Sequence, residues 1–274
     1  MQDFLKLADW TWSSNPTFFG PLHIIYLILS PTLMVLFAWL LRKSNEKQNK
    51  IILLSIGIFL ILTEIWKHLF YWFVVHNASG EYPWWIFSWQ LCSIPMYVVC
   101  FAPFIKKARV RRAFYDFLLA FAGLGGIMMH LEPSGAFTIN HIVLTFHSLV
   151  WHSLLLFIAM YLAISNRAGR RLLDFFPGLI IFGGTAVIAE IINVIFYYTI
   201  GVPLNMFFIS PFRRTTIAIF SNIYDAAGPW ASIPLYLFAL CLGGFLIHFC
   251  TYYIRKIINI HNPTKYITIL DDNK

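Results

Sequence analysis

The segment PWWIFSWQLCSIPMYVVCFAPFI (residues 83–105) is apolar and long enough to cross a membrane, since a spanning helix needs roughly 20 mostly apolar residues. Its middle is nevertheless polar, because Gln90, Cys92 and Ser93 follow one another closely there. Pro95 has no backbone N–H, so a helix over this segment would lose a hydrogen bond and bend beside Cys92. The segment therefore predicts a kinked membrane helix with a polar wall.

The composition of the whole chain indicates an integral membrane protein. Of its 274 residues, 59% are hydrophobic and 12% are charged, and the mean hydropathy is +0.71. Soluble domains average about 25% charged residues. We expect an all-α, polytopic fold that forms one transmembrane domain over residues 1–274 and lies as a multi-pass protein in the cell membrane. Seven transmembrane helices are predicted, at about 20–41, 51–75, 84–105, 112–130, 138–163, 174–199 and 230–254.

The connections between these spans alternate in charge. The basic ones are RKSNEKQNK (42–50), KKARVRR (106–112) and NRAGRR (166–171), and those without lysine or arginine are 76–82 and 131–137. The positive-inside rule then places the N-terminus outside and the C-terminus in the cytoplasm. The formal charge of +8 is accordingly a topology signal that can also contact anionic lipids, and no nucleic-acid partner is expected.

The segment 200–229 is predicted to lie outside as one long loop. A connection of this length usually has a function or folds on the surface. A simple outer loop and a re-entrant or interfacial element are both compatible with its sequence.

Most ionisable and amide side chains of the predicted spans fall in their outer halves, and such groups are costly in a bilayer unless they pair or have a function. This asymmetry predicts a polar cavity that opens outward, although a polar cap of loops would give the same pattern. Candidate pocket residues are Cys92, His152, His147, Gln90, Ser93, Asn193 and Glu190, and candidates for headgroup or ion binding are Glu64, Lys67, His68, Arg213, Arg214 and Asp225.

Several of these residues also have a structural explanation. Glu64, Lys67 and His68 are spaced i, i+3 and i+4, so they share a helix face and can neutralise one another. Glu190 and Asn193 also share a face, and a polar contact between helices would explain them equally well.

Cys92 is the candidate nucleophile, but a thiol in apolar surroundings is inert unless a base or a cation activates it. The histidines whose depth brackets Cys92 are His147 and His152. They lie roughly 140° apart around a helix, so we expect only one of them to face a given pocket. The alternative is a small buried cysteine in a kinked helix. No zinc-ligand spacing and no glycine-rich phosphate loop occurs, so neither a metal nor a cofactor is expected.

Five stretches together resemble the YwaF-like family of bacterial membrane proteins: WQLCSIP (89–95), RRAFYDFLLAFAGLGGIM (111–128), WHSLLLFIAMYL (151–162), NVIFYYTIGVPLNMFFIS (193–210) and DAAGPWASIPLYLF (225–238). That family is similar to the animal transmembrane acyltransferase that remodels ether phospholipids. The resemblance covers about residues 20–250 and implies a seven-span protein with an essential cysteine and histidine. Cys92 matches the cysteine, and His152 matches the histidine, whereas Gln90 stands where a histidine often stands.

Two functions of different classes follow. The first is a phospholipid acyltransferase in which Cys92 holds the acyl group as a thioester and His152 acts as the base, with Gln90, Ser93 or Asn193 as oxyanion donor. Its partners would be membrane lipids, including a lysophospholipid or acyl-lipid substrate. The alternative is non-enzymatic binding or transport of a small amphiphile or ion through the same cavity. A third, a helper in cell-envelope assembly that docks a partner through residues 200–229, stays open, as does the oligomeric state.

Overall fold

The computed structural model describes residues 2–78 and 82–260, and this part of the chain is helical with no strand. Backbone polar groups inside a bilayer must be satisfied within the protein, which favours helices. Among the described residues, six helical stretches are long and apolar enough to cross a membrane. They are Pro21–Leu40, Glu46–Val75, Ala108–Leu131, Ile142–Ile164, Leu172–Ile200 and Pro229–Ile258, and they coincide to within a few residues with six of the predicted spans.

The elements that make up these stretches are α2 (Pro21–Leu40), α3 (Glu46–Phe70), α5 (Ala108–Phe117), α6 (Gly123–Leu131), α8 (Ile142–Ile164), α9 (Phe175–Ile195) and α11 (Pro229–Ile260). Single π-helical turns extend α3 over Tyr71–Val75, join α5 to α6 over Leu118–Ala122, and extend α9 over Phe196–Ile200. Short helices lie between them: α1 (Gln2–Lys6), α4 (Ile94–Phe101), α7 (Ser134–Phe137) and α10 (Ala218–Ala227).

The predicted span 84–105 is not one continuous helix, so the expectation of seven spanning helices is not confirmed. A 3₁₀ turn covers Trp84–Ile86, residues 87–93 are irregular, and only the stretch Ile94–Phe104 forms a short apolar helix. Pro95 lies in the first turn of this helix, where its missing N–H leaves no helical hydrogen bond unmade. The helix begins at Ile94 instead of continuing through Pro95 with a kink. Irregular backbone at membrane depth is tolerated where it is buried in protein or lines a cavity.

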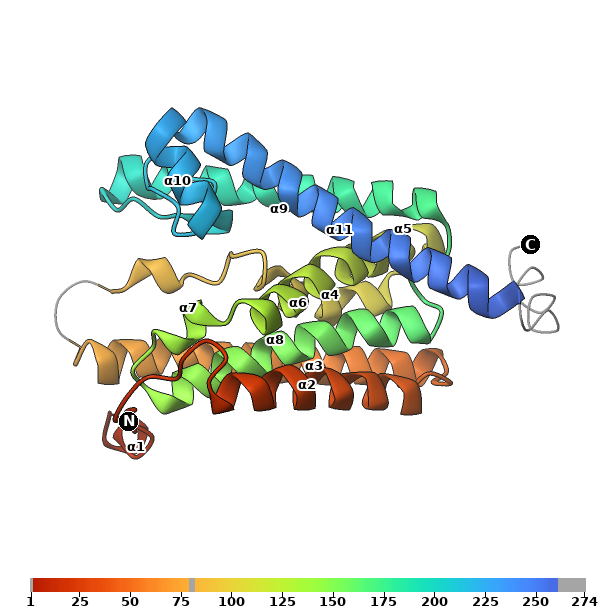
Figure 1. Cartoon of the computed structure of the whole chain (residues 1–274), viewed down its shortest axis with the longest axis horizontal. Coiled ribbons are helices and arrows are strands. Elements are labelled where there is room, and N and C mark those ends of the chain that lie inside the picture. Colours follow the sequence, from red (N-terminus) through yellow and green to blue (C-terminus); the bar gives the residue numbers. More distant parts are fainter. Residues whose placement is uncertain (1, 79–81, 261–274) are drawn as a thin grey trace.

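The helices form an elongated bundle in which the chain runs back and forth between two ends (Figure 1). One end carries α1, α7 and α10, and we call it the α10 end. The opposite end carries the connections between α2 and α3, between α4 and α5, and between α8 and α9, which include the basic loops. The grouping of the basic loops at one end agrees with the alternation in the sequence, while the orientation in a membrane stays a prediction.

Helix α8 lies at the centre of the bundle, packed against α2 and α6. The approach to α6 is close because Gly126 has no side chain where it meets the backbone of Leu156. A polar network also joins α8 to these two helices: Ser30 Oγ lies 2.7 Å from Ser153 Oγ and 2.8 Å from His130 Nε2. These contacts fix α8, and with it the side chains that α8 presents to its other neighbours.

Candidate functional site

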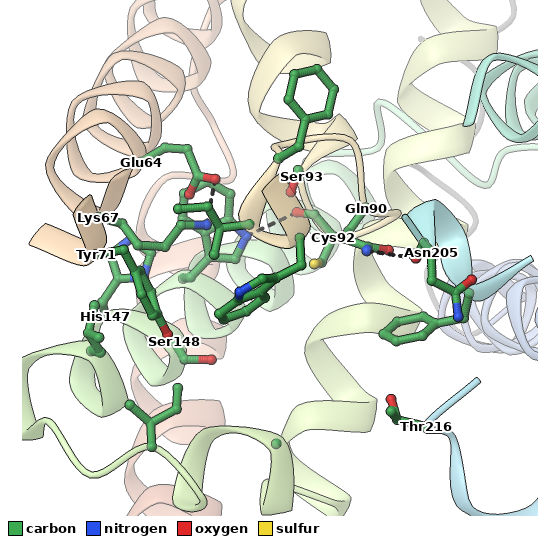
Figure 2. A pocket seen from close by; sticks show the side chains of 18 of the residues that line it. Glu64, Lys67, Tyr71, Gln90, Cys92, Ser93, His147, Ser148, Asn205 and Thr216 are labelled. Atoms are coloured by element: carbon green, nitrogen blue, oxygen red, sulfur yellow. Dashed lines mark hydrogen bonds and ion pairs between the residues drawn. The ribbon is translucent and has the colours of Figure 1, made fainter. Parts of the chain in front are cut away.

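A cavity of about 440 Å³ lies between α3, the irregular segment 87–93, α8 and the segment 205–216. Most of the residues selected from the sequence line it: Glu64, Lys67, Gln90, Cys92, Ser93, His147, His152, Arg213 and Arg214. Figure 2 shows Cys92 in the middle of the site, with Glu64, Lys67 and His147 on one side and Asn205 and Thr216 on the other. A volume of this size suits a small ligand or part of a larger one.

Cys92 lies directly before the helix α4, not inside a helix as the sequence suggested. Ser93 is the residue before the first turn of α4, and Pro95 lies within that turn. The indole Nε1 of Trp151 donates a 3.0 Å hydrogen bond to the carbonyl oxygen of Cys92 and so holds its backbone. The N-terminal end of a helix carries a partial positive charge, which stabilises an anion placed there. Cys92 therefore lies at the N-terminal end of a helix and in the wall of the cavity.

His152 has a defined tautomer. Its Nδ1 lies 2.8 Å from the carbonyl oxygen of Ser148, and a carbonyl can only accept, so Nδ1 must donate. The neutral ring then carries its lone pair on Nε2, the atom that could take a proton. His152 lines the same cavity as Cys92.

Both histidines of α8 line the cavity, although the sequence suggested that only one would. The stripe of α8 that faces the cavity is wide, since Leu144, His147, Ser148, Trp151 and His152 all contribute to it. The two histidines form opposite edges of this stripe, as an angle of roughly 140° requires. The buried Nε2 of His147 has no hydrogen-bond partner among the described residues.

The acidic and basic residues of α3 pair as their spacing predicted. Glu64 Oε1 accepts hydrogen bonds from Lys67 Nζ at 2.6 Å and from Ser88 Oγ at 2.5 Å, and His68 Nε2 lies 3.4 Å from the same oxygen. Glu64 and Lys67 line the cavity, whereas His68 turns to Ser88 and Tyr82. The pair brings one negative and one positive charge to the wall of the cavity.

Gln90 and Asn193 hold the segment 205–216 in place. The Gln90 amide donates to the carbonyl oxygen of Asn205 at 3.0 Å and accepts from the N–H of Phe207 at 2.8 Å. Asn193, fully buried, accepts from the N–H of Met206 at 2.7 Å and donates to its carbonyl at 3.2 Å. Asn193 is not among the residues that line the cavity, and the oxyanion role expected for it stays a prediction. Its amide satisfies the backbone of the segment.

Arg213 and Arg214 lie at the rim, and one of them is already paired. Arg214 donates two hydrogen bonds to the carboxylate of Asp225, at 2.6 and 2.5 Å. These bonds hold the pKa of Asp225 below its ordinary value. Arg213 donates to the carbonyl oxygen of Pro203 at 3.2 Å. Asp225 therefore serves the segment 205–216 as a partner for Arg214, and not as an open ion-binding group.

Glu190 lies outside this cavity, in a groove between α9 and α11. Its Oε2 accepts a 3.1 Å hydrogen bond from Asn193, the contact that their shared face predicted. Among the described residues, no group of three or more histidine, cysteine or acidic side chains could hold a metal ion.

Three residues that shape the site were not selected from the sequence: Ser88, Trp151 and Asn205. Ser88 forms hydrogen bonds with both Glu64 and His68. Trp151 donates to the carbonyl oxygen of Cys92, and the carbonyl oxygen of Asn205 accepts from the Gln90 amide. A serine and a tryptophan in apolar runs carry little signal by themselves, because their partners lie on other elements of the fold.

The fold and the cavity define a multi-pass helical membrane protein with a polar site inside its bundle. The chain belongs to the TMEM164 family, whose family model matches residues 18–252. The match includes every residue of the cavity. It is consistent with the expected relation to an animal transmembrane protein, while the YwaF-like assignment stays a prediction. Neither the curated proteins nor the solved structures contain a match.

Proposed function

We propose that this protein transfers acyl groups between membrane lipids through a thioester on Cys92, with His152 as the general base. The observation that carries the proposal is that Cys92 lies at the N-terminal end of α4, in the same cavity as a histidine whose Nδ1 is committed to Ser148. A cysteine activated by a base and a helix terminus is the usual arrangement of a thiol nucleophile.

The reaction has two halves. In the first, the Cys92 thiol gives its proton to Nε2 of His152, and the sulfur attacks the ester carbonyl of an acyl lipid. The carbon–oxygen bond of the ester breaks, the leaving alkoxide takes the proton from His152, and the acyl group stays on Cys92 as a thioester. In the second, His152 takes the proton of an acceptor alcohol, whose oxygen attacks the thioester. The new ester leaves, and the sulfur regains the proton.

The oxyanion that forms in both halves needs hydrogen-bond donors placed in advance. The backbone N–H of Cys92 makes no backbone hydrogen bond within the described part of the chain. The bond from Trp151 holds the Cys92 carbonyl on the other side of this residue. We assign the oxyanion to this N–H. Gln90 contributes by holding the surrounding segment, because its amide is bonded to residues 205 and 207.

The charges at the wall of the cavity suit a lipid headgroup. Lys67 lines the cavity beside Glu64, and Arg213 lies at the rim without an acidic partner among the described residues. A phosphate of the donor or acceptor lipid would meet these two cations, with the apolar side chains around Phe208 left for the acyl chain.

The ion pair of Glu64 and Lys67 supports the second candidate function, which is non-enzymatic binding or transport of a small amphiphile or ion. Glu64 and Lys67 line the cavity and lie 2.6 Å apart, so an ion or headgroup could compete for either of them. The two functions predict opposite effects of substitutions at the ion pair and at Cys92. Loss of the pair should abolish transport, whereas loss of the thiol should leave it intact.

The test is intact-protein mass spectrometry after incubation with phospholipid, with and without neutral hydroxylamine, which cleaves thioesters. We expect a labile acyl mass on Cys92 that disappears in Cys92→Ala. Cys100→Ala is the matched control, since Cys100 lies eight residues later, within α4, and outside the cavity lining. His152→Gln should slow acyl transfer by about 10²–10⁴-fold, the usual contribution of a general base. Unchanged transfer in folded Cys92→Ala protein would rule out the mechanism and leave binding or transport as the explanation.

A further inference from the structure

A second hollow lies between α9 and α11 and is separate from the cavity of Cys92. It is a groove of about 480 Å³, and Ile209 and Pro211 also line it. Its two walls repeat every four residues: Leu179, Gly183 and Val187 on α9, and Ile233, Leu237 and Cys241 on α11. Each wall therefore extends about 12 Å along its helix, at 1.5 Å per residue. The walls are apolar over this length, as a hydrocarbon chain requires.

Gly183 opens the groove on the α9 side. A Cβ added at this residue would meet no atom within 4 Å, so a side chain larger than hydrogen would extend into the open space. Helix α11 crosses α9 obliquely (Figure 1), and the two helices make few direct contacts. Both belong to the stretches that are apolar enough to span a membrane. The groove is thus open at a depth where the surroundings consist of lipid chains.

Glu190 places a carboxylate in the same groove. The side chain is half-buried, and its hydrogen bond comes from the neutral amide of Asn193. No basic side chain forms an ion pair with it within the described part of the chain. A carboxylate in a membrane segment is costly unless a cation pairs with it or it takes up a proton, so a positively charged group in the groove would stabilise its ionised form.

Trp230 marks the level of Glu190 in the membrane. It is the second residue of α11, lines the groove and is 81% exposed. Exposed tryptophans concentrate where the bilayer meets water. Helices α9 and α11 run in opposite directions, so the late position of Glu190 in α9 matches the early position of Trp230 in α11. The end of the groove that carries Glu190 therefore lies at the level of the lipid headgroups. The end that carries Gly183 lies at the level of the acyl chains.

We propose that the groove between α9 and α11 binds a membrane lipid whose ammonium headgroup pairs with Glu190 and whose acyl chain lies between the two walls. This site does not depend on acyl transfer by Cys92. The chemistry favours a zwitterionic lipid with an ammonium group over an anionic lipid without one, because the latter brings no positive charge to the carboxylate.

The experiment uses phosphatidylethanolamine with a photoreactive diazirine in its acyl chain, added to the full-length protein in nanodiscs, followed by peptide mapping. Labelling of peptides from α9 and α11 is expected. Gly183→Leu should reduce this labelling by about threefold or more, the size typical of a single interaction within a membrane. Gly184→Leu is the matched control, because Gly184 is equally open but does not line the groove. Equal labelling of these two variants would overturn the proposal.

The role of the headgroup is tested with phosphatidylglycerol, an anionic lipid, that carries the same diazirine-labelled acyl chain. We expect weaker labelling than with phosphatidylethanolamine, and Glu190→Gln should abolish the difference. Equal labelling by the two lipids in the unmodified protein would show that Glu190 does not select lipids with an ammonium headgroup, and would overturn this part of the proposal. Cys92→Ala should retain the full labelling, so a failure of the acyl-transfer mechanism would leave this result unchanged and the two proposals can be judged separately.

Discussion

The closest approach of α6 to α8 gives a quantitative prediction. In Gly126→Ala, the new Cβ would lie 2.8 Å from the backbone nitrogen of Leu156 and 3.0 Å from its Cα. Backbone atoms cannot turn aside as a side chain can, so the helices must move apart. The neighbouring Gly125→Ala is the matched control, because its Cβ would meet only Leu155 Cδ1, at an ordinary 3.6 Å.

The magnitude follows from these contacts. Both substitutions gain helix propensity equally, up to about 1 kcal/mol. Gly126→Ala alone adds the strain of overpacking, about 1–3 kcal/mol. The free energy of unfolding of Gly126→Ala should therefore be lower than that of Gly125→Ala by about 1–3 kcal/mol. For a chain of this size, each kcal/mol corresponds to roughly 2–4 °C in Tm. Thermal unfolding of the two variants in detergent measures the difference.

Gly126→Ala should also alter the geometry of the proposed active site. Leu156 lies one turn after His152 on α8, so a movement of α8 away from α6 shifts the histidine relative to Cys92. Acyl transfer should fall in Gly126→Ala and stay normal in Gly125→Ala. Equal Tm values for the two variants would refute the claim that the missing side chain of Gly126 sets the distance between these helices.

Two further predictions concern the supports of the site. Trp151→Phe removes the hydrogen bond to the Cys92 carbonyl and keeps most of the ring, so acyl transfer should fall by about tenfold, consistent with a loss of about 1.4 kcal/mol, and Tm should fall by a few degrees. The pKa of Asp225 is lowered by Arg214, so their bond stabilises the segment 205–216 above the ordinary pKa of 3.8 and is lost as the pH falls through the lowered value. At neutral pH, hydrogen exchange of this segment should be faster in Asp225→Asn than in the unmodified protein, and no increase in that variant would contradict the assignment. At acidic pH, the protection of this segment relative to its intrinsic exchange rate should fall.

The amino-acid sequence by itself determined the class of protein and the approximate bounds of six membrane helices. This is possible because a helix in a bilayer satisfies its own backbone, so length and apolar composition suffice to recognise it. The pairing of Glu64 with Lys67 could be predicted for the same reason, since their spacing of three residues brings them together on any helix.

Contacts between elements were decided only by the tertiary structure. The sequence placed Cys92 inside a helix, but the helix begins after it, because the irregular segment 87–93 is supported by distant partners. Gln90 is bonded to residues 205 and 207, and Trp151 to the carbonyl of Cys92. Such bonds join residues from 59 to 117 positions apart, and no local periodicity records them. Which polar groups face the cavity and which hold its walls therefore depends on how the helices pack.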